Sequence, residues 1–495
     1  MRRSLVLSLV ATTLVACALD PTPTPTAQKG TARALGVYTT NLDPDLERQA
    51  YDALARDAQR REHRFLDAAD PGHLARSIRV EQSDLEAGAH SPEEIFQLGA
   101  QIFHATFTLE MGYGGKDLPH LARFHAGRRG GPDAMRCDSC HWRGGPGGAG
   151  DAADNAYLDG DGDRQSSALA RNPPSLVGAG LVELVAREMS AELGRAREAL
   201  VARAKAEGKP ARGPLVAKGV AFGELEARPD GRLDGTSVLG VDTDLVVKPF
   251  GWKGHFASLR DVVEDELNVH HGMQSTWLVA HGDPARVGAF GGTDPDGDGI
   301  TDEVREGQVT ALVLFLAMQE VPVTDTPVDQ DHVVALGKGE ARFQALGCAT
   351  CHVPSLTLES AVYSLPSREG GAPIRVDLQK DAALPRIAPP FDGGPLRLYL
   401  YSDLKRHDMG PGLAEREADR AVRPGTFLTR PLWGIARSRP YLHDARAPTL
   451  EDAILLHGGE AQAARDAFAA LSEPERGELR VFLTSLTRAR RLSVP

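Results

Sequence analysis

Two short stretches decide how this sequence is interpreted: Cys137-Asp138-Ser139-Cys140-His141 and Cys348-Ala349-Thr350-Cys351-His352. Both have the pattern C-x-x-C-H, which is typical of the covalent attachment of a c-type haem. Two thiols at this spacing can reach the two vinyl groups of one porphyrin, and the next residue can then ligate the iron through its imidazole. The sequence therefore predicts two covalent haems, with His141 and His352 as the proximal iron ligands.

The remaining cysteine usage supports this interpretation. Of the five cysteines, Cys17 lies near the N-terminus and the other four form the two C-x-x-C pairs. A four-cysteine zinc site would bring the two pairs together, and two C-x-x-C disulfides would suit an exported protein. Neither alternative accounts for the histidine that follows each pair directly, so two haems are the favoured prediction.

The N-terminus predicts export. Met1-Arg2-Arg3 precedes an apolar run from Ser4 to Ala16, which is typical of a secretory signal and too short to span a bilayer. The run ends at Cys17 in a pattern that resembles the lipobox of bacterial lipoproteins, and a Pro-Thr tether follows. We expect a lipid on Cys17 that anchors the protein in the bacterial cell envelope, on the periplasmic side, as an outer-membrane lipoprotein. An ordinary signal peptide with an incidental Cys17 is the alternative.

Length and composition limit both the fold and the partners. A chain of 495 residues is too long for one ordinary core, and 52 glycines and 33 prolines indicate much loop. The net charge of −12, without a basic run, argues against nucleic acid as a partner. We therefore expect a mostly α fold with long loops, built from more than one domain.

Local patterns give the expected elements and domain boundaries. Ser91-Pro92-Glu93-Glu94 predicts the start of a helix, with serine as the N-cap. Further predicted elements are a charged helix at 182–207, a small β hairpin at 231–247, an apolar helix at 309–318 and a closing helix at 474–486. The predicted segments are a signal peptide at 1–17, a tether and N-terminal segment at 18–90, and two cytochrome c-like domains at 91–325 and 326–495.

An internal repeat supports the two domains. The ten residues from Trp252 to Asp261 align with those from His443 to Asp452. Upstream of each lies a related piece, 172–178 in the first copy and 429–434 in the second. Each half therefore contains a haem motif, a turn with proline, leucine and glycine, and a helix start, as expected for a duplicated cytochrome c domain with different insertions.

The order of these motifs resembles the bacterial dihaem cytochrome c peroxidase superfamily, and within it the dihaem oxidoreductases that are also labelled thiol oxidoreductases. The matching pieces are Cys137 to His141 with Gly147 to Gly150, Asn172 to Leu176, Phe250 to Gly254, Cys348 to His352, His407 to Gly410, and Tyr441 to Asp444 with Thr449 to Glu451. The resemblance implies two facing haem domains. The N-terminal haem would be reactive, and the C-terminal haem would pass electrons to it.

The resemblance also implies roles for single residues. Trp252 lies in the W-x-G motif, whose tryptophan lies between the two haems in that superfamily. Met409 precedes a glycine, as does the methionine that ligates the electron-transfer haem, and thioether ligation raises the reduction potential. His407 is the competing ligand. Trp252 and Met409 as ordinary core side chains are the alternative.

The reactive side departs from the peroxidases, which place a distal glutamate soon after the W-x-G helix. A titratable group at that point assists cleavage of the peroxide O–O bond. This sequence instead has Asn268-Val269-His270-His271-Gly272-Met273 there. We expect His270 and His271 to lie near the first haem, where a histidine could act as the acid–base group or could ligate the iron and close the site. Two surface histidines are the alternative.

Two acidic segments have the spacing of cation-binding loops. In the first, carboxylates alternate with turn-forming residues: Asp294, Asp296, Asp298 and Asp302. Arg305 stands where an EF-hand has its bidentate glutamate, so we predict a calcium site in the shorter loop only. A weaker cluster comprises Asp159, Asp161 and Asp163. A solvated acidic turn is the alternative for both.

Taken with the resemblance, these motifs predict an exported dihaem oxidoreductase of the peroxidase type. Peroxide or another small oxidant would react at the first haem, and a small cytochrome or a cupredoxin would donate electrons to the second. A haem oxidase that modifies a protein or organic substrate is one alternative. A plain electron-transfer cytochrome with both haems six-coordinate is the other, and the spin state of the first haem distinguishes the enzymes from the carrier.

Overall fold

The computed structural model describes residues 78–114, 123–125, 128–130, 134–151, 155–158, 168–281, 294, 298–325, 329–368, 370–389, 393–416 and 421–489. All of these residues lie within one compact unit of the chain. Several predictions fall outside them: the signal peptide, Cys17, the Pro-Thr tether, Asp296, and the cluster of Asp159, Asp161 and Asp163.

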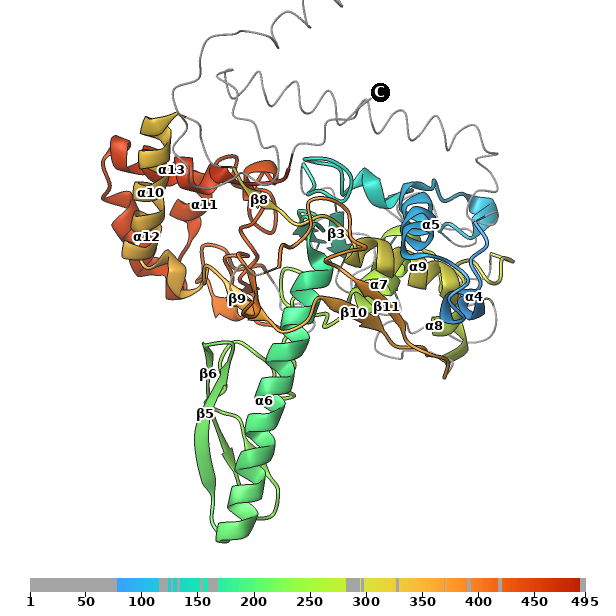
Figure 1. Ribbon diagram of the computed structural model, residues 1–495, viewed down its shortest axis with the longest axis horizontal. Helices are drawn as coiled ribbons and strands as arrows, with labels where there is room; N and C mark the ends of the chain where they lie inside the picture. Colours follow the sequence, from blue (N-terminus) through green and yellow to red (C-terminus); the bar gives the residue numbers. More distant parts are fainter. Residues whose placement is uncertain are drawn as a thin grey trace, which may run out of the picture. The chain divides into compact units, whose positions relative to one another are not determined.

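Helices form the larger elements of the fold (Figure 1). They are α4 (Gln82–Glu86), α5 (Pro92–His104), α6 (Ala179–Glu207), α7 (Leu259–His271), α8 (Thr276–His281), α9 (Glu306–Ala317), α10 (Gln330–Ala345), α11 (Leu450–Leu456), α12 (Gln462–Ala469) and α13 (Glu473–Ser485). Short 3-10 turns, including η2 (Cys137–Ser139) and η4 (Cys348–Thr350), lie between them.

The strands are short and pair in small antiparallel sheets. They are β1 (Arg123–His125), β2 (Arg128–Gly130), β3 (Asn155–Leu158), β4 (Ala168–Arg171), β5 (Ala211–Ala217), β6 (Val220–Ala227), β7 (Leu233–Asp234), β8 (Val323–Thr324), β9 (Leu356–Leu358), β10 (Val362–Leu365), β11 (Ile374–Asp377), β12 (Leu396–Leu398), β13 (Arg406–Asp408), β14 (Thr426–Leu428) and β15 (Leu486–Thr487). The pairs are β1-β2, β3-β4, β8-β15, β9-β12, β10-β11, β13-β14 and the three-stranded β5-β6-β7. The fold is thus a mixture of helices and small sheets, with more strand than the mostly α prediction allowed.

The predicted helices are confirmed, with slightly different ends. α5 begins at the expected point, where Ser91 accepts a hydrogen bond from the Glu94 amide (3.3 Å) and the Glu94 carboxylate accepts one from the Ser91 amide (2.7 Å). This reciprocal capping box satisfies two amides that the helix itself leaves without partners. The charged helix is α6, the apolar helix is α9, and the closing helix is α13.

The predicted hairpin at 231–247 is wrong. The hairpin lies earlier, in β5 and β6, whose turn residues Lys218 and Gly219 both have positive φ (49° and 80°), as a tight two-residue turn requires. Only β7 adds a short third strand. At 230–247 the carboxylates of Asp230, Asp234 and Asp244 each accept a hydrogen bond from the amide two residues on, which favours successive turns over a ladder.

Each half contains a pair of helices that cross at a glycine. α5 packs on α9, and α10 packs on α13; the first helix of each pair also contacts the C-x-x-C-H turn of its half. A Cβ on Gly99 would collide with the carbonyl oxygen of Ala311, and a Cβ on Gly339 with that of Glu478. The missing side chains let the backbones approach closely, so the two halves close their helix pairs in the same way.

The internal repeat is confirmed by matching backbone contacts. In the first copy Phe250 forms an antiparallel bridge with Phe256, and in the second Tyr441 forms one with Ala447. A helix then follows in each copy. Ser258 caps α7 by accepting from the amide three residues on, and Thr449 caps α11 in the same way. These positions correspond one to one in the sequence alignment of the two copies.

The two copies contact each other through their equivalent turns. A Cβ on Gly178 would come within 2.5 Å of the Trp433 ring, and one on Gly434 would come within 3.9 Å of Val177. Both glycines have positive φ (70° and 78°). The proline-leucine-glycine turns that the sequence shows twice therefore pack against one another.

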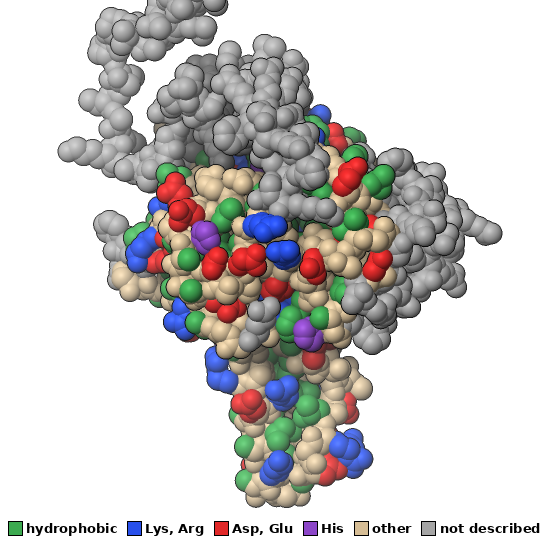
Figure 2. Space-filling model, turned by 90° about the vertical axis from the view of Figure 1, so that its right-hand side faces the viewer, with side chains coloured by type: hydrophobic (Ala, Val, Ile, Leu, Met, Phe, Trp, Pro, Cys, Tyr) green, Lys and Arg blue, Asp and Glu red, His purple; other side chains and the backbone are tan. Residues whose placement is uncertain are grey.

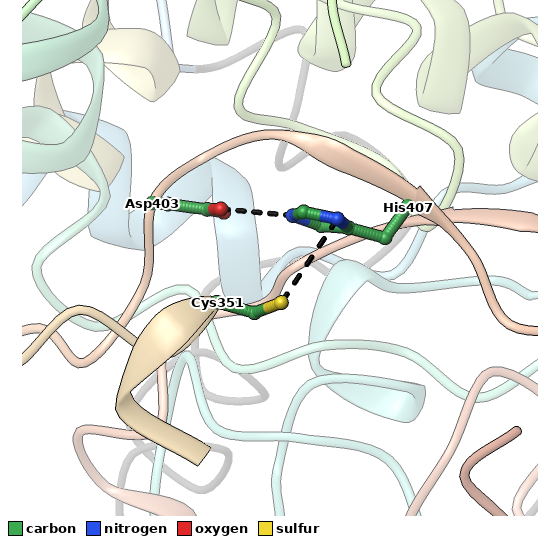
Figure 3. Close-up of side chains that lie close together, drawn as sticks. All are labelled: Cys351, Asp403 and His407. Carbon is green, nitrogen blue, oxygen red and sulfur yellow. Dashed lines mark hydrogen bonds and ion pairs between the residues drawn. The ribbon is translucent and has the colours of Figure 1, made fainter. Parts of the chain in front are cut away.

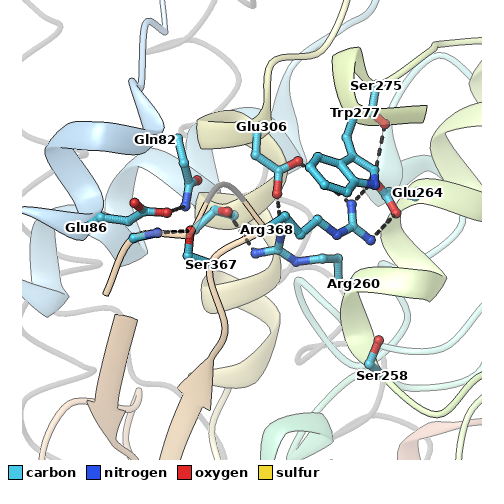
Figure 4. A network of polar contacts seen from close by, with 12 residues as sticks. Gln82, Glu86, Ser258, Arg260, Glu264, Ser275, Trp277, Glu306, Ser367 and Arg368 are labelled. Atoms are coloured by element: carbon cyan, nitrogen blue, oxygen red, sulfur yellow. Dashed lines mark hydrogen bonds and ion pairs between the residues drawn. The ribbon is translucent and has the colours of Figure 1, made fainter. Parts of the chain in front are cut away.

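A buried network of ion pairs joins segments that are distant in the sequence (Figure 4). Arg260 of α7 pairs with Glu306 of α9. Arg368, from the loop between β10 and β11, makes two hydrogen bonds to Glu264 of α7 (2.6 and 2.9 Å), and Ser275 donates to the same carboxylate (3.2 Å). The network thus fixes a loop of the C-terminal half against helices of the N-terminal half.

Charged side chains of both signs are mixed on the visible face in Figure 2. Many of them form exposed pairs, such as Arg212 with Glu224 and Arg232 with Asp230. Among the residues that the structure describes, no helix combines the length and the apolar character needed to cross a membrane.

Candidate haem sites

The first C-x-x-C-H motif forms a tight turn that presents its histidine. η2 contains Cys137, and the backbone amide of His141 donates to the Cys137 carbonyl (3.2 Å). The His141 Nδ1 lies 3.2 Å from the carbonyl oxygen of Gly148, which accepts its hydrogen bond. Burial lowers the pKa of His141, so the imidazole is neutral. A neutral imidazole oriented by a carbonyl at Nδ1 is the arrangement that metal-ligating histidines use.

The second motif repeats this geometry. The His352 amide donates to the Cys348 carbonyl (2.9 Å), and its Nδ1 lies 3.1 Å from the carbonyl oxygen of Tyr401. Burial lowers the pKa of His352 to about 4. Each proximal histidine is thus held by a backbone carbonyl outside its own motif.

The four cysteines of the motifs are free thiols. Burial raises the pKa of Cys137, and it raises that of Cys348 to about 11, so both remain protonated. Free thiols at this spacing beside a neutral, oriented imidazole fit a covalently attached haem in both motifs. Neither pair is joined by a disulfide in the structure.

His271 lies against the first motif. Its Nε2 is 3.9 Å from the Cys137 sulfur, its Nδ1 donates to the Ala134 carbonyl (2.7 Å), and its ring contacts Phe107 with centroids 5.0 Å apart. The side chain is 3% exposed. The structure therefore places His271 beside the first C-x-x-C-H motif and buries it, so the surface alternative is wrong for it.

His270 is also buried but has a different neighbour, since its Nε2 forms an ion pair with Glu266 (2.7 Å). The charges of Glu266 and His270 both act on the pKa of His141, after the larger effect of burial, so these side chains lie near the proximal histidine. Sequence reasoning missed Glu266. It lies one turn before His270 on α7, and this i, i+4 spacing was the available signal.

His407 lies beside the second motif with both ring nitrogens engaged (Figure 3). Its Nε2 bonds Asp403 (2.8 Å) and its Nδ1 bonds Glu460 (2.7 Å), with the Cys351 sulfur 3.9 Å away. Burial alone would lower the pKa of His407, but the hydrogen bonds to Asp403, the Cys351 sulfur and Glu460 raise it to about 11. A protonated imidazole has no lone pair to offer iron, so the geometry does not favour His407 as a ligand.

Met409 is partly buried and continues from β13, with its amide donating to the Gly425 carbonyl (2.8 Å). The Met409 carbonyl oxygen lies close to Gly458, because a Cβ added to Gly458 would come within 2.9 Å of this oxygen. Met409 therefore lies beside the segment that begins with His457.

His457 is a candidate that sequence reasoning missed. Its Nδ1 donates to the Ala453 carbonyl (2.7 Å), burial lowers its pKa, and its charge lowers the pKa of His352. The signal was in the internal repeat, because continuing the alignment of the two copies pairs Glu266 with His457. One residue at the same repeat position thus lies near the proximal histidine in each half.

Trp252 lies where the two copies meet. Its indole nitrogen donates to the Asn172 carbonyl (2.7 Å), its carbonyl accepts from the Leu428 amide (2.9 Å), and its ring lies 6.5 Å from that of His443. The next residue, Lys253, is fully buried, and its ammonium group forms an ion pair with the Glu415 carboxylate (3.0 Å).

The described part of the acidic loop forms turns. Asp294 accepts a hydrogen bond from the Gly299 amide (2.9 Å), and Asp298 accepts one from the Ile300 amide (2.6 Å). Asp302 has a positive φ of 58°. These contacts shape the loop, and calcium binding stays a prediction.

Solved structures show only weak likenesses. A MauG-like protein associated with microbial copper homeostasis is 15% identical, and the match covers 80% of this chain and 89% of that one with a TM-score of 0.33. Hydrazine synthase of Kuenenia stuttgartiensis is 18% identical, and the match covers 38% of this chain and 57% of that one with a TM-score of 0.24. Neither likeness supports an argument about function. No curated protein matches the chain significantly.

The sequence of the C-terminal half gives the informative comparison. Residues 291–486 match the family described as "Di-haem oxidoreductase, putative peroxidase". The matched region contains the second haem motif, His407, Met409 and His457, while the first motif lies before it. The match confirms the resemblance to the dihaem oxidoreductases of the cytochrome c peroxidase type that the order of the motifs predicted.

Proposed function

We propose that the protein is an exported dihaem c-type oxidoreductase that reduces peroxide at its first haem with electrons from its second. One observation carries the proposal: the two C-x-x-C-H motifs hold their histidines identically, but different residues occupy the equivalent position near each histidine. Glu266 lies near His141, and His457 lies near His352. A carboxylate suits acid–base work, and an imidazole suits iron ligation.

The first site supplies proton transfer. A haem held by Cys137, Cys140 and His141 would supply the redox chemistry for peroxide. Glu266 and His270 lie 2.7 Å apart and would deliver a proton to a peroxide oxygen, while His271 is held by Ala134 and Phe107. Burial of both histidines excludes bulk water from this side of the motif.

The second site supplies electrons. A haem held by Cys348, Cys351 and His352 would suit an electron relay if a further side chain ligated its iron. His457, whose charge acts on the pKa of His352, is our candidate for this ligand, and Met409 is the ligand that the motif predicted; the two lie on neighbouring segments. Trp252, at the contact between the copies, would couple the two sites.

The remaining assignments are expectations that accompany this proposal. A small cytochrome or cupredoxin would donate electrons, calcium would bind the loop around Asp294, and a lipid on Cys17 would hold the protein in the envelope. The Pro-Thr tether after Cys17 would keep the haem domains at a distance from the membrane.

Haem content and spin state test the proposal together. A pyridine haemochrome assay with intact mass should give two covalent haems per chain, and electron paramagnetic resonance of the half-reduced protein should show a high-spin first haem that responds to peroxide. Fewer than two haems would reject it.

A second candidate function is a plain electron carrier. The contact of 3.9 Å between His271 and Cys137 favours it, because a histidine so close to the haem attachment point could ligate the first iron. In that case the first haem would be low-spin in every oxidation state and would not react with peroxide.

A further inference from the structure

A buried histidine–aspartate pair lies inside the first haem motif. Asp138 follows Cys137 in the turn between the two attachment cysteines, and its carboxylate lies 2.9 Å from Nδ1 of His104, the last residue of α5. An ionised carboxylate only accepts hydrogen bonds, so the imidazole donates. His104 is 7% exposed and Asp138 is 2% exposed. The pair therefore holds an acidic group, shielded from bulk water, within the turn that would carry the first haem.

The helix pairs of the two halves share one register, which defines the equivalent positions in the second half. The Phe103 ring packs on Phe315 of α9 with centroids 5.2 Å apart, and the Phe343 ring packs on Phe482 of α13 with centroids 5.3 Å apart. Phe103 and Phe343 each lie four positions after the glycine at which their helix crosses its partner. The two helices can therefore be aligned residue by residue.

The second half has different residues at both positions of the pair. The next position on the aligned helices matches His104 with Gln344, which is exposed. The alignment of the two C-x-x-C-H motifs matches Asp138 with Ala349, whose side chain has no polar group. The two motifs orient their histidines in the same way, but only the first has a buried carboxylate at this position.

The charge of Asp138 acts on the haem attachment point. Burial is the largest cause that raises the pKa of the Cys137 thiol, and the charge of Asp138 is the next. A haem gains one positive charge on oxidation, and charges in a buried site interact more strongly than charges in water. Local charge and burial are among the properties by which a protein sets a haem potential. Resting on the proposed dihaem function, we propose that Asp138, held by His104, stabilises the oxidised state of the first haem and so lowers its reduction potential.

This role suits the division of labour between the two motifs. Reaction with peroxide removes electrons from the first site, and the carboxylate of Asp138 favours the more positive state that results. The second motif, which would pass electrons on, has Ala349 in place of this carboxylate. His104 acts through Asp138 and is a positioning residue, because its hydrogen bond fixes the carboxylate within the turn.

Spectroelectrochemical titration of the holoprotein at pH 7 tests the proposal. Asp138→Asn removes the charge but keeps the size of the side chain and an oxygen that can accept from His104. The midpoint potential of one haem should therefore rise, while that of the other haem and the thermal unfolding temperature stay close to the wild-type values. Asp138→Glu should restore part of the wild-type potential, and both variants should keep two haems.

Glu224→Gln is the matched control, because Glu224 lies on β6 in an exposed pair with Arg212; both potentials should stay unchanged. Unchanged potentials in Asp138→Asn would overturn the proposal and leave the pair a purely structural role, as would equal shifts of both haems. Absence of two haems in the wild type would instead reject the proposed function itself. Two haems that do not react with peroxide would also reject that function, while a rise of one potential in Asp138→Asn would still support the role of Asp138.

Discussion

Trp252 and His443 occupy the same position in the two copies of the internal repeat, and their rings contact each other with centroids 6.5 Å apart. Each is also held by the other copy, since Trp252 accepts from the Leu428 amide and the His443 carbonyl accepts from the Asn172 amide (2.6 Å). Burial, assisted by the charges of neighbouring cations, lowers the pKa of His443 to about 3, so its ring is neutral. The duplicated halves therefore meet at equivalent residues, with one copy supplying an indole and the other a neutral imidazole.

The sixth ligand of the second haem can be identified with two variants. His457→Ala should convert the low-spin signal of that haem to high-spin, because the buried imidazole near His352 is lost. Met409→Ala should leave the low-spin signal in place. Electron paramagnetic resonance and near-infrared magnetic circular dichroism distinguish bis-histidine from histidine–methionine ligation, and a histidine–methionine spectrum in the wild type would show that Met409 is the ligand.

Proton transfer at the first site should depend on Glu266. Glu266→Gln removes the carboxylate that pairs with His270 and should lower peroxide turnover about 100-fold, within the range for loss of an acid–base group. His271→Ala should also lower turnover, because the group fixed against Cys137 is lost. Both variants should keep two haems. Full activity in each variant would place the acid–base group elsewhere.

The ion pair between Arg368 and Glu264 should stabilise the contact between the two halves. Arg368→Met leaves Glu264, which is 1% exposed, without its bidentate partner and should lower the free energy of unfolding by about 2–3 kcal/mol. The double variant with Glu264→Met should recover part of the loss. Arg212 forms an exposed pair with Glu224, so Arg212→Met should change the free energy of unfolding by less than about 1 kcal/mol in urea titrations. Equal losses for Arg368 and Arg212 would contradict the role.

His407 should make stability depend on pH in a defined direction. Its pKa is raised to about 11 in the fold from an ordinary value of 6.5. Its charge therefore stabilises the fold fully below about pH 6.5, and this contribution declines as the pH rises toward 11. The difference in unfolding free energy between wild type and His407→Gln should be largest near pH 6 and should shrink by pH 10. A difference that grows with pH would refute the ion-pair assignment.

Calcium removal tests the acidic loop. If the carboxylates around Asp294 bind the ion, excess chelator should lower the thermal unfolding temperature, and added calcium should restore it. Metal analysis of the purified protein should give about one calcium per chain. Asp298→Asn should weaken the response to chelator, whereas unchanged melting together with an absence of calcium would reject the site.

Several features followed from the sequence alone because they depend on neighbouring residues. The haem motifs need contiguous cysteines and histidine, the capping box at Ser91 needs a glutamate three residues on, and the duplicated turns and helix starts are visible as aligned strings. The hairpin prediction at 231–247 failed because it considered only the alternation of apolar residues. In the structure, aspartate side chains accept hydrogen bonds from backbone amides there, so these amides do not form a strand ladder.

Tertiary structure decided which distant side chains meet. The sequence specified two C-x-x-C-H motifs, but only the fold brought His271 to Cys137, placed carboxylates at both ring nitrogens of His407, and brought Trp252 and His443 together. The physical reason is that a haem motif is a local pattern of neighbouring residues. The contacts listed above depend instead on the angles at which helices cross and on the paths of the long insertions between them. Neither the helix crossings nor the paths of the insertions can be inferred from the sequence pattern alone.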